Sequence, residues 1–369
     1  MARSLRIRWL SAVLGTLLVL SGIVVLATQA FSSPNLPPVT PRELIASVVR
    51  AAEAPPPISG EVSVRFSLGL PSLPAEVSGP ANGPATFLAY LTGAHRLRVW
   101  RSVDGVRVAE LMSAGERALF VNRSDAWAWD SRTFTAYHLG PFPASALLRG
   151  TGYSAGGLAP LGLADPERLA QLSLQAVSPY AAVSVGPSLR VAGRDAYSLV
   201  LAPRTPDTLV GRIVISVDAK QRVPLGVEVF PRGSGKAAIS AAFTAVSFAP
   251  IARSTFDFTP PRGAKVEWPC HLRPGESSEG GIGEPGVAFA PGRLPRVFGT
   301  GWSTILALPL PSSADLSRAS GEARSILASL LPFSGTLLSA RLVDRGDHQW
   351  FLVGAVPQSA LAKVQTELS

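Results

Sequence analysis

The sequence predicts an α+β protein: a large antiparallel sheet with few helices, followed by a small α/β unit. Two observations predict this. Many short segments alternate apolar and polar residues with period two and are joined by brief turns, whereas a few segments repeat apolar residues at helical spacing. Hydrophobic residues make up 47% and charged residues 16% of the 369 positions, which excludes a disordered, highly charged chain. The 34 glycines and 33 prolines indicate many turns between short elements.

An apolar segment near the N-terminus predicts where the protein resides. Trp9–Thr28 carries no charge and follows three arginines, Arg3, Arg6 and Arg8. Its 20 residues would span ~30 Å as a helix, the thickness of a bilayer core. We expect a single-pass anchor within residues 1–30, with the N-terminus in the cytoplasm and the bulk of the chain extracytoplasmic. The alternative is a cleaved signal sequence ending at Thr28–Ala30, which would leave a secreted or periplasmic protein.

A capped helix is predicted directly after the tether. Thr40–Glu43 has the form of a capping box with proline at the first helical position. Apolar residues then recur at helical spacing as far as Ala52, and Pro55–Pro57 ends the helix.

From Ile58 the apolar period changes to two, which predicts strands. Val62, Val64, Phe66 and Leu68 alternate with polar residues in the first strand. Six more strands are expected at Thr86–Leu91, His95–Arg101, Val106–Met112, Arg117–Asn122, Ala126–Asp130 and Thr133–Leu139. Turns this short permit only antiparallel pairing, because parallel neighbours need a long crossover.

A second run of strands follows a Gly/Ala-rich loop at residues 149–163 and a short helix opened by Asp165–Glu167. Its strands are predicted at Ser188–Val191, Ala196–Leu201, Leu209–Val217, Leu225–Phe230 and Ala237–Phe248. The Gly/Pro-rich residues 269–296 are expected to link residues 41–268 to a small α/β unit at 297–369. That unit is predicted to contain strands at 304–310, 335–343 and 349–355 and helices at 314–330 and 358–367.

The residues that could carry chemistry give mostly negative results. A phosphate-binding loop and an H-E-x-x-H zinc motif are absent, and Gly233–Lys236 is interpreted as a turn. His95 and His138 are expected to be packed or solvated strand residues. Cys270–His271 is the only Cys/His adjacency and could be a metal half-site or a nucleophile, but we favour an ordinary thiol. We therefore expect no enzyme activity, no cofactor and no metal.

Charge gives one further exclusion. The formal net charge is +9, which is compatible with contact to an anionic surface. No basic helix or basic run marks a nucleic-acid site, so nucleic acid is not an expected partner.

Aromatic residues concentrate in the first run of strands. Trp127 and Trp129 are two residues apart on a strand and so share a face, with Phe134 close by. They could be packed core residues or the wall of an apolar groove. A large sheet with few helices leaves apolar area that something must cover, and an apolar ligand is one candidate.

Five segments carry a resemblance to a known family. They are Ile58–Val62, Leu68–Pro71, Val191–Tyr197 (VAGRDAY), Arg212–Asp218 and Pro224–Val229. Together with the element order, they resemble the periplasmic lipoprotein-carrier superfamily, which includes LolA-type carriers and the N-terminal domain of RseB/MucB regulators. The resemblance covers roughly residues 41–268 and leaves the C-terminal unit unmatched.

The resemblance implies an open half-barrel: a curved antiparallel sheet of about eleven strands whose concave side is plugged by helices. The implied function is a non-catalytic, membrane-tethered binding module for lipids or lipoprotein acyl chains. The alternative is a regulator that binds a membrane anti-sigma factor and senses lipid or envelope stress. In that case the protein partner would dock on the C-terminal unit.

Alternation along the strands suggests which side chains would line such a cavity. The inward candidates are Val62, Val64, Phe66, Leu68, Leu199, Leu201, Ile213 and Ile215, with Trp127, Trp129 and Phe134 at the mouth. A hollow lined with paired charges would contradict this hypothesis.

Overall fold

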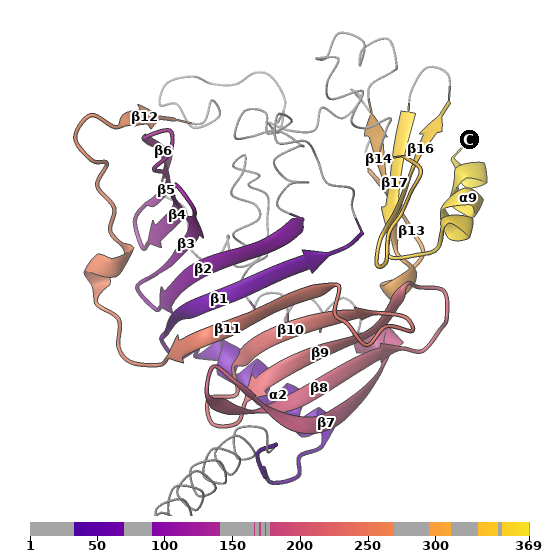
Figure 1. The fold of residues 1–369 in the computed structure, drawn as a ribbon, viewed down its shortest axis with the longest axis horizontal. Helices are drawn as coiled ribbons and strands as arrows, with labels where there is room; N and C mark the ends of the chain where they lie inside the picture. The colour runs from indigo at the N-terminus through magenta and orange to yellow at the C-terminus, as the bar shows by residue number, and fades with distance from the viewer. Residues whose placement is uncertain are drawn as a thin grey trace, which may run out of the picture.

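The larger of two sheets is curved, has twelve strands and does not close into a barrel (Figure 1). In the computed structural model the described residues are 33–69, 91–140, 178–268, 295–310, 331–345 and 349–368, together with Pro166, Ala170 and Leu174. The strand order is β12-β6-β5-β4-β3-β2-β1-β11-β10-β9-β8-β7, so β12 and β7 form the two edges. This is the open, curved sheet that the sequence predicts, with one strand more than expected.

The first run of strands is an antiparallel meander, as predicted. Its strands are β1 Ile58–Ser67, β2 Thr92–Ser102, β3 Gly105–Met112, β4 Gly115–Asn122, β5 Ala126–Asp130 and β6 Thr135–Gly140. Ser102 pairs with Gly105 and Met112 with Gly115, so two-residue loops connect β2 to β3 and β3 to β4. The strand expected at Thr86–Leu91 lies outside the described residues, apart from Leu91.

The second run of strands is also a meander. Its strands are β7 Ala181–Val191, β8 Arg194–Pro203, β9 Val210–Asp218, β10 Pro224–Pro231 and β11 Ile239–Ser247. The turn from β7 to β8 holds Ala192 at φ 50° and Gly193 at φ 75°. Two successive left-handed residues form the turn type that matches the twist of paired strands.

Two long-range pairings complete the sheet. β1 pairs antiparallel with β11, which joins the two meanders side by side. β12 (Lys265–Glu267), a short edge strand that the sequence analysis does not predict, pairs with β6 in parallel. The chain between β6 and β12 includes β7–β11 and the 3-10 helix Arg253–Phe256, so it is longer than the crossover that parallel pairing requires.

The predicted capped helix is α2, Pro41–Glu53. The Thr40 hydroxyl accepts from the Glu43 N–H, and the Glu43 carboxylate accepts from the Thr40 N–H at 2.9 Å, which closes the capping box. Leu44 and Val48 are buried in the core of the large sheet. Pro166, Ala170 and Leu174 are helical, within the second helix expected from the sequence.

A smaller five-stranded sheet follows, in the order β13-β14-β17-β16-β15. Its strands are β13 Arg296–Phe298, β14 Ile305–Leu310, β15 Phe333–Ser334, β16 Ser339–Asp344 and β17 Gln349–Gly354, and helix α9 is Gln358–Glu367. Leu361 and Val364 of α9 pack on this sheet with Trp350 and Leu352. The helix expected at 314–330 lies outside the described residues.

Candidate functional site

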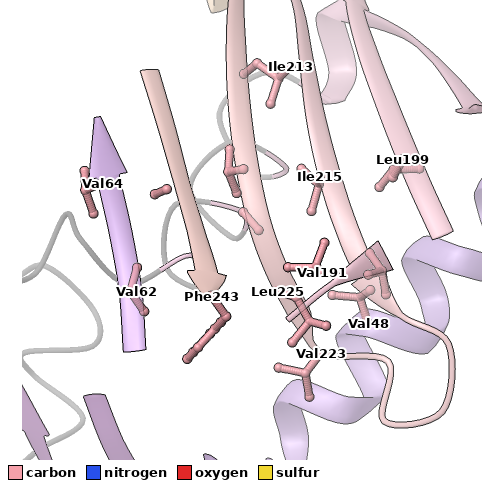
Figure 2. Close-up of a cluster of buried hydrophobic side chains, with 14 of the residues drawn as sticks. Val48, Val62, Val64, Val191, Leu199, Ile213, Ile215, Val223, Leu225 and Phe243 are labelled. Carbon is pink, nitrogen blue, oxygen red and sulfur yellow. The ribbon is translucent and has the colours of Figure 1, made fainter. Parts of the chain in front are cut away.

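The eight inward candidates lie on one face of the large sheet, here called the inner face. All belong to a single buried cluster, and none is more than 9% exposed (Figure 2). Leu68 directly follows β1, and the other seven come from β1, β8 and β9; β1 is far from β8 and β9 in sequence. The structure therefore brings together residues that the sequence could only suggest strand by strand.

Strand register makes this surface continuous. On the inner face Leu199 pairs with Ile215, and Ile215 pairs with Val227. Val227 in turn pairs with Ala241, which pairs with Val64. One unbroken apolar row thus crosses β8, β9, β10, β11 and β1, because side chains directly opposite on neighbouring strands share a face.

Helical residues belong to the same buried cluster as this apolar row. Leu44 and Val48 of α2 belong to the same buried cluster, and Figure 2 shows Val48 close to Val191 and Val223 at the ends of the strands. Ala170 is fully buried in the cluster, and Leu174 packs against it. The inner face is therefore a packed core beneath two helical segments.

The inner face is not apolar throughout. His95 Nδ1 lies 2.9 Å from a carboxylate oxygen of Glu110, and the two side chains are 15% and 8% exposed. Arg117 and Asp130 lie 3.4 Å apart and are similarly buried. Register places Glu110 opposite Arg117 and Arg117 opposite Asp130, so one charged row crosses β3, β4 and β5.

This charged row limits how far the predicted apolar cavity can extend along the inner face. Burial, reinforced by the nearby carboxylates of Glu267 and Asp130, raises the pKa of Tyr137 next to it. The expectation of a uniformly apolar hollow is wrong for this end of β3–β5. The unbroken apolar row lies on the other strands.

Trp127, Trp129 and Phe134 lie on the opposite, outer face, so they do not form a mouth for the inner apolar surface. Ala128, between the two tryptophans, points inward, which places both indoles outward. Phe258 packs on them, with ring centroids 5.8 Å from each. Phe134 meets Trp129 edge to face and remains 44% exposed. The sequence could not reveal this, because alternation shows which residues share a face but not which face is concave.

His138 belongs to a packed cluster at this outer edge. Its ring stacks on Trp127 with centroids 4.1 Å apart, and Trp268 meets it edge to face. Asp125 accepts from the Trp127 indole N–H at 2.9 Å and lies 2.7 Å from His138 Nε2. Within the described ranges, no group of His, Cys, Asp and Glu could hold a metal ion.

Two other motifs from the sequence analysis can be located in the chain. Gly233–Lys236 forms the turn between β10 and β11, as expected, where the Ser234 hydroxyl accepts from the Lys236 N–H. Cys270–His271 lies outside the described residues.

A further motif falls within residues 149–163, the segment expected to be a Gly/Ala-rich loop. Gly152–Gly156 reads GYSAG and matches the G-x-S-x-G pattern of hydrolase nucleophiles. It lies outside the described residues, so neither Ser154 nor a base for it is placed. That pattern carries the chemistry when it joins a strand to a helix in an α/β sheet, whereas the large sheet here is almost wholly antiparallel.

The family-like segments hold the second meander together. Arg194 of the VAGRDAY segment pairs with Asp218, whose carboxylate also accepts from the N–H groups of Lys220 and Gln221. Burial acts to raise the pKa of Asp218, but these hydrogen bonds outweigh it and hold the pKa below its usual value. The Tyr197 hydroxyl donates to the Pro37 carbonyl and ties the N-terminal segment to β8. These residues position the fold and do not line the apolar row.

The expected N-terminal anchor lies outside the described residues. Residues 1–32, which contain the apolar run Trp9–Thr28, fall outside the described part of the chain. Among the residues that the structure describes, none of the helices has the length and apolarity needed to cross a bilayer.

Comparison with known proteins finds similarity among solved structures. No protein-family model matches the sequence, and no curated protein matches it. The Pseudomonas aeruginosa MucA/MucB complex aligns over 88% of this chain and 96% of the matched chain, with 13% identity and a TM-score of 0.47. A crystal structure of MucB aligns over the same shares, with 15% identity and a TM-score of 0.43.

A LolA-superfamily protein from Nitrosomonas europaea covers 60% of this chain and 99% of its own, with 9% identity and a TM-score of 0.25. The solved structures that this chain is similar to thus include MucB and a LolA-superfamily protein.

Proposed function

We propose that this chain is an extracytoplasmic, membrane-tethered binding module for lipids or lipoprotein acyl chains, and that it performs no catalysis. The observation that carries this proposal is the apolar row from Leu199 to Val64, which crosses five strands of an open sheet. A saturated chain needs a surface of this kind and no polar partner. Each methylene that it buries would contribute ~0.8 kcal/mol.

The cover over the row determines how a ligand would enter. Because Val64, Leu199 and Ile215 are fully buried, an acyl chain must lie between the sheet and the residues that now cover it. The described helical residues of the same buried cluster are Leu44, Val48 and Ala170, with Leu174 packed against it. An acyl chain would replace one apolar contact with another, so partial displacement of this cover exposes little apolar surface to water.

The charged row indicates which strands an acyl chain would lie along. His95–Glu110 and Arg117–Asp130 occupy the inner face of β2–β5, where burying an acyl chain against paired charges would disrupt their hydrogen bonds. The acyl chain is therefore expected along β8–β11 and β1, with its polar end directed away from that region.

Photolabelling with a diazirine fatty acid tests the site directly. We expect the label on peptides that carry Val64, Leu199 and Ile215, and native mass spectrometry of the purified protein should detect co-purified lipid. Labels confined to outer-face positions, together with a lipid-free protein, would exclude the proposal.

Two neighbouring positions on β11 provide a matched pair of variants. Ala241 is fully buried on the inner face, whereas Ala242 faces outward across from Gly226, which has no side chain to obstruct a larger neighbour. Ala241→Phe should fill the inner face and reduce fatty-acid uptake at least tenfold, while Ala242→Phe should leave uptake unchanged. Circular dichroism checks that both variants fold; equal uptake by both folded variants would count against this location.

The regulator alternative is favoured by one observation. The small sheet has a core of its own, built from residues such as Trp350 and Leu361, and the inner apolar row does not use it. Val297, on its edge strand β13, is 64% exposed. A photo-crosslinker at Val297 should capture a single-pass membrane anti-sigma factor in cells, whereas a crosslinker at Val103 in the β2–β3 turn should not. Capture at neither position, or equally at both, argues against this role.

A further inference from the structure

Four arginines lie together on the outer face of the large sheet. Leu97 and Val99 point into the buried core, so Arg96 and Arg98 of β2 point outward. By the same alternation Arg65 of β1 and Arg107 of β3 lie on this face, beside them. We call Arg65, Arg96, Arg98 and Arg107 the arginine patch.

Strand register makes the patch continuous. Arg65 pairs with Ala94, two residues from Arg96 on the same face. Arg98 follows Arg96 by two residues and pairs with Ala109, which lies two residues from Arg107. Each arginine therefore has the next as a diagonal or same-strand neighbour, roughly 7–8 Å away, within reach of long side chains.

The patch has little opposing charge. Glu61 lies opposite Arg98, and their side chains approach to 3.3 Å while both remain about half exposed. Arg65 and Arg96 are exposed and have no ion-pair partner within the described ranges. The other outward carboxylates in register with the patch are Glu116, which lies two strands from Arg96, and Glu228, which lies two strands from Arg65. Like charges side by side on a sheet lower its stability, so this arrangement costs the fold something that an anionic partner would offset.

Arg107 is held in place at one end of the patch. Its guanidinium lies over the rings of Trp100 and Phe120, at 4.8 and 4.6 Å from their centroids. This cation–π packing fixes the charge at the surface without neutralising it.

We propose that the arginine patch docks the protein on the surface of a bilayer that contains anionic phospholipid. Arginine binds phosphate through paired N–H donors, and clusters of such cations attract anionic headgroups. A protein partner would usually require a buried apolar anchor at the centre of the contact. Its apolar neighbours, Trp100 under the Arg107 guanidinium and Leu111 opposite Arg96, are not among the exposed large apolar residues of the described chain. Mobile headgroups can instead adapt to the spacing of four separate charges.

This inference does not depend on acyl-chain binding, which uses the inner face. The proposed N-terminal tether would hold the protein near the membrane, and the arginine patch would determine which side of the sheet faces that membrane. A failure of one proposal therefore leaves the other intact.

The experiment measures how close the patch comes to lipid. A fluorophore is attached to Ser63→Cys, opposite Arg96 on the outer face, in the full chain with Cys270→Ser. The protein is reconstituted with phosphatidylcholine vesicles, with and without phosphatidylglycerol, that carry a headgroup quencher. We expect quenching only with phosphatidylglycerol, and we expect it to fall as salt is raised because salt screens exposed charges.

The decisive variant is Arg65→Gln/Arg96→Gln/Arg98→Gln. Each cation near an anionic surface contributes roughly fivefold to association, so this variant should lower the patch–lipid association about 100-fold. The matched control, Arg42→Gln/Arg50→Gln/Arg262→Gln, removes the same charge from exposed positions elsewhere and should retain the quenching.

Three outcomes would overturn the inference. They are equal quenching on both kinds of vesicle, an equal loss of quenching in the patch variant and the control, and no quenching of the labelled protein whose arginine patch is intact. Binding of soluble poly-glutamate that only the patch variant loses, without quenching on vesicles, would instead assign the patch to an acidic polypeptide.

Discussion

At the residue scale, the family-like segments act through a buried ion pair. Asp218 is 1% exposed and accepts hydrogen bonds from Arg194 and two backbone N–H groups at the turn between β9 and β10. Arg194 is the first residue of β8, directly after the β7–β8 turn, so the pair connects two hairpins. These residues identify a fold because they fix adjacent turns, and for the same reason they reveal nothing about a ligand.

Asp218→Asn should destabilise the protein by about 2 kcal/mol near neutral pH, because the hydrogen bonds lose their charged acceptor. The folded-state pKa of Asp218 is lowered, so its stabilising contribution is present above the unfolded pKa of ~3.9 and is lost as pH falls through the folded value. The difference between wild type and variant should therefore shrink below about pH 4.

Urea unfolding at several pH values measures this effect. Asp195→Asn, which removes an exposed partner of Arg190, is the control and should change stability by less than about 1 kcal/mol. A pH-independent difference between Asp218→Asn and wild type would contradict the assignment.

At the element scale, the chain from β11 to β12 acts as a strap over the outer face. Phe258 stacks on Phe120 with centroids 4.7 Å apart and also contacts Trp127 and Trp129. The strap ends in β12, whose pairing with β6 extends the sheet by one short strand. It explains why tryptophans on the outer face are not fully exposed: they are covered by the chain itself.

Phe258→Ala should remove this cover and destabilise the protein by about 2–4 kcal/mol. Exposure of the indoles should also shift tryptophan emission to longer wavelength in the folded protein. Val103→Ala, at a position 82% exposed, is the control and should leave both stability and emission unchanged. Wild-type emission from a folded Phe258→Ala protein would contradict the proposed cover.

At the scale of the whole molecule, the two sheets share core and backbone contacts. Trp302, just before β14, is buried in the core of the large sheet, and its indole N–H donates to the Tyr180 carbonyl at 3.2 Å. Thr208 donates to the Ala355 carbonyl at 2.7 Å. Gly301 allows this approach, since a Cβ there would lie 2.3 Å from the Tyr180 ring. The small sheet is thus part of what stabilises the large one.

Trp302→Ala should therefore destabilise both sheets, by about 3–5 kcal/mol, although the residue lies in the C-terminal part of the sequence. Differential scanning calorimetry of wild type should show one transition, and the variant should show two as the sheets separate. Trp350→Ala provides the contrast, because Trp350 is buried only in the small sheet's own core and should affect mainly that unit. Unfolding of the large sheet at an unchanged temperature in Trp302→Ala would contradict this coupling.

The sequence by itself determined the local structure: the Thr40 capping box, the strands with period-two alternation, and the grouping of Val62, Val64, Phe66 and Leu68 on one face. These depend on neighbouring residues and on the geometry of single elements. Only the tertiary structure decided that β1 pairs with β11, that β12 pairs with β6, and that Trp127 and Trp129 face away from Val64. Alternation gives two faces to every strand, and only the pairing of distant strands and the side on which the helices pack determine which face is buried.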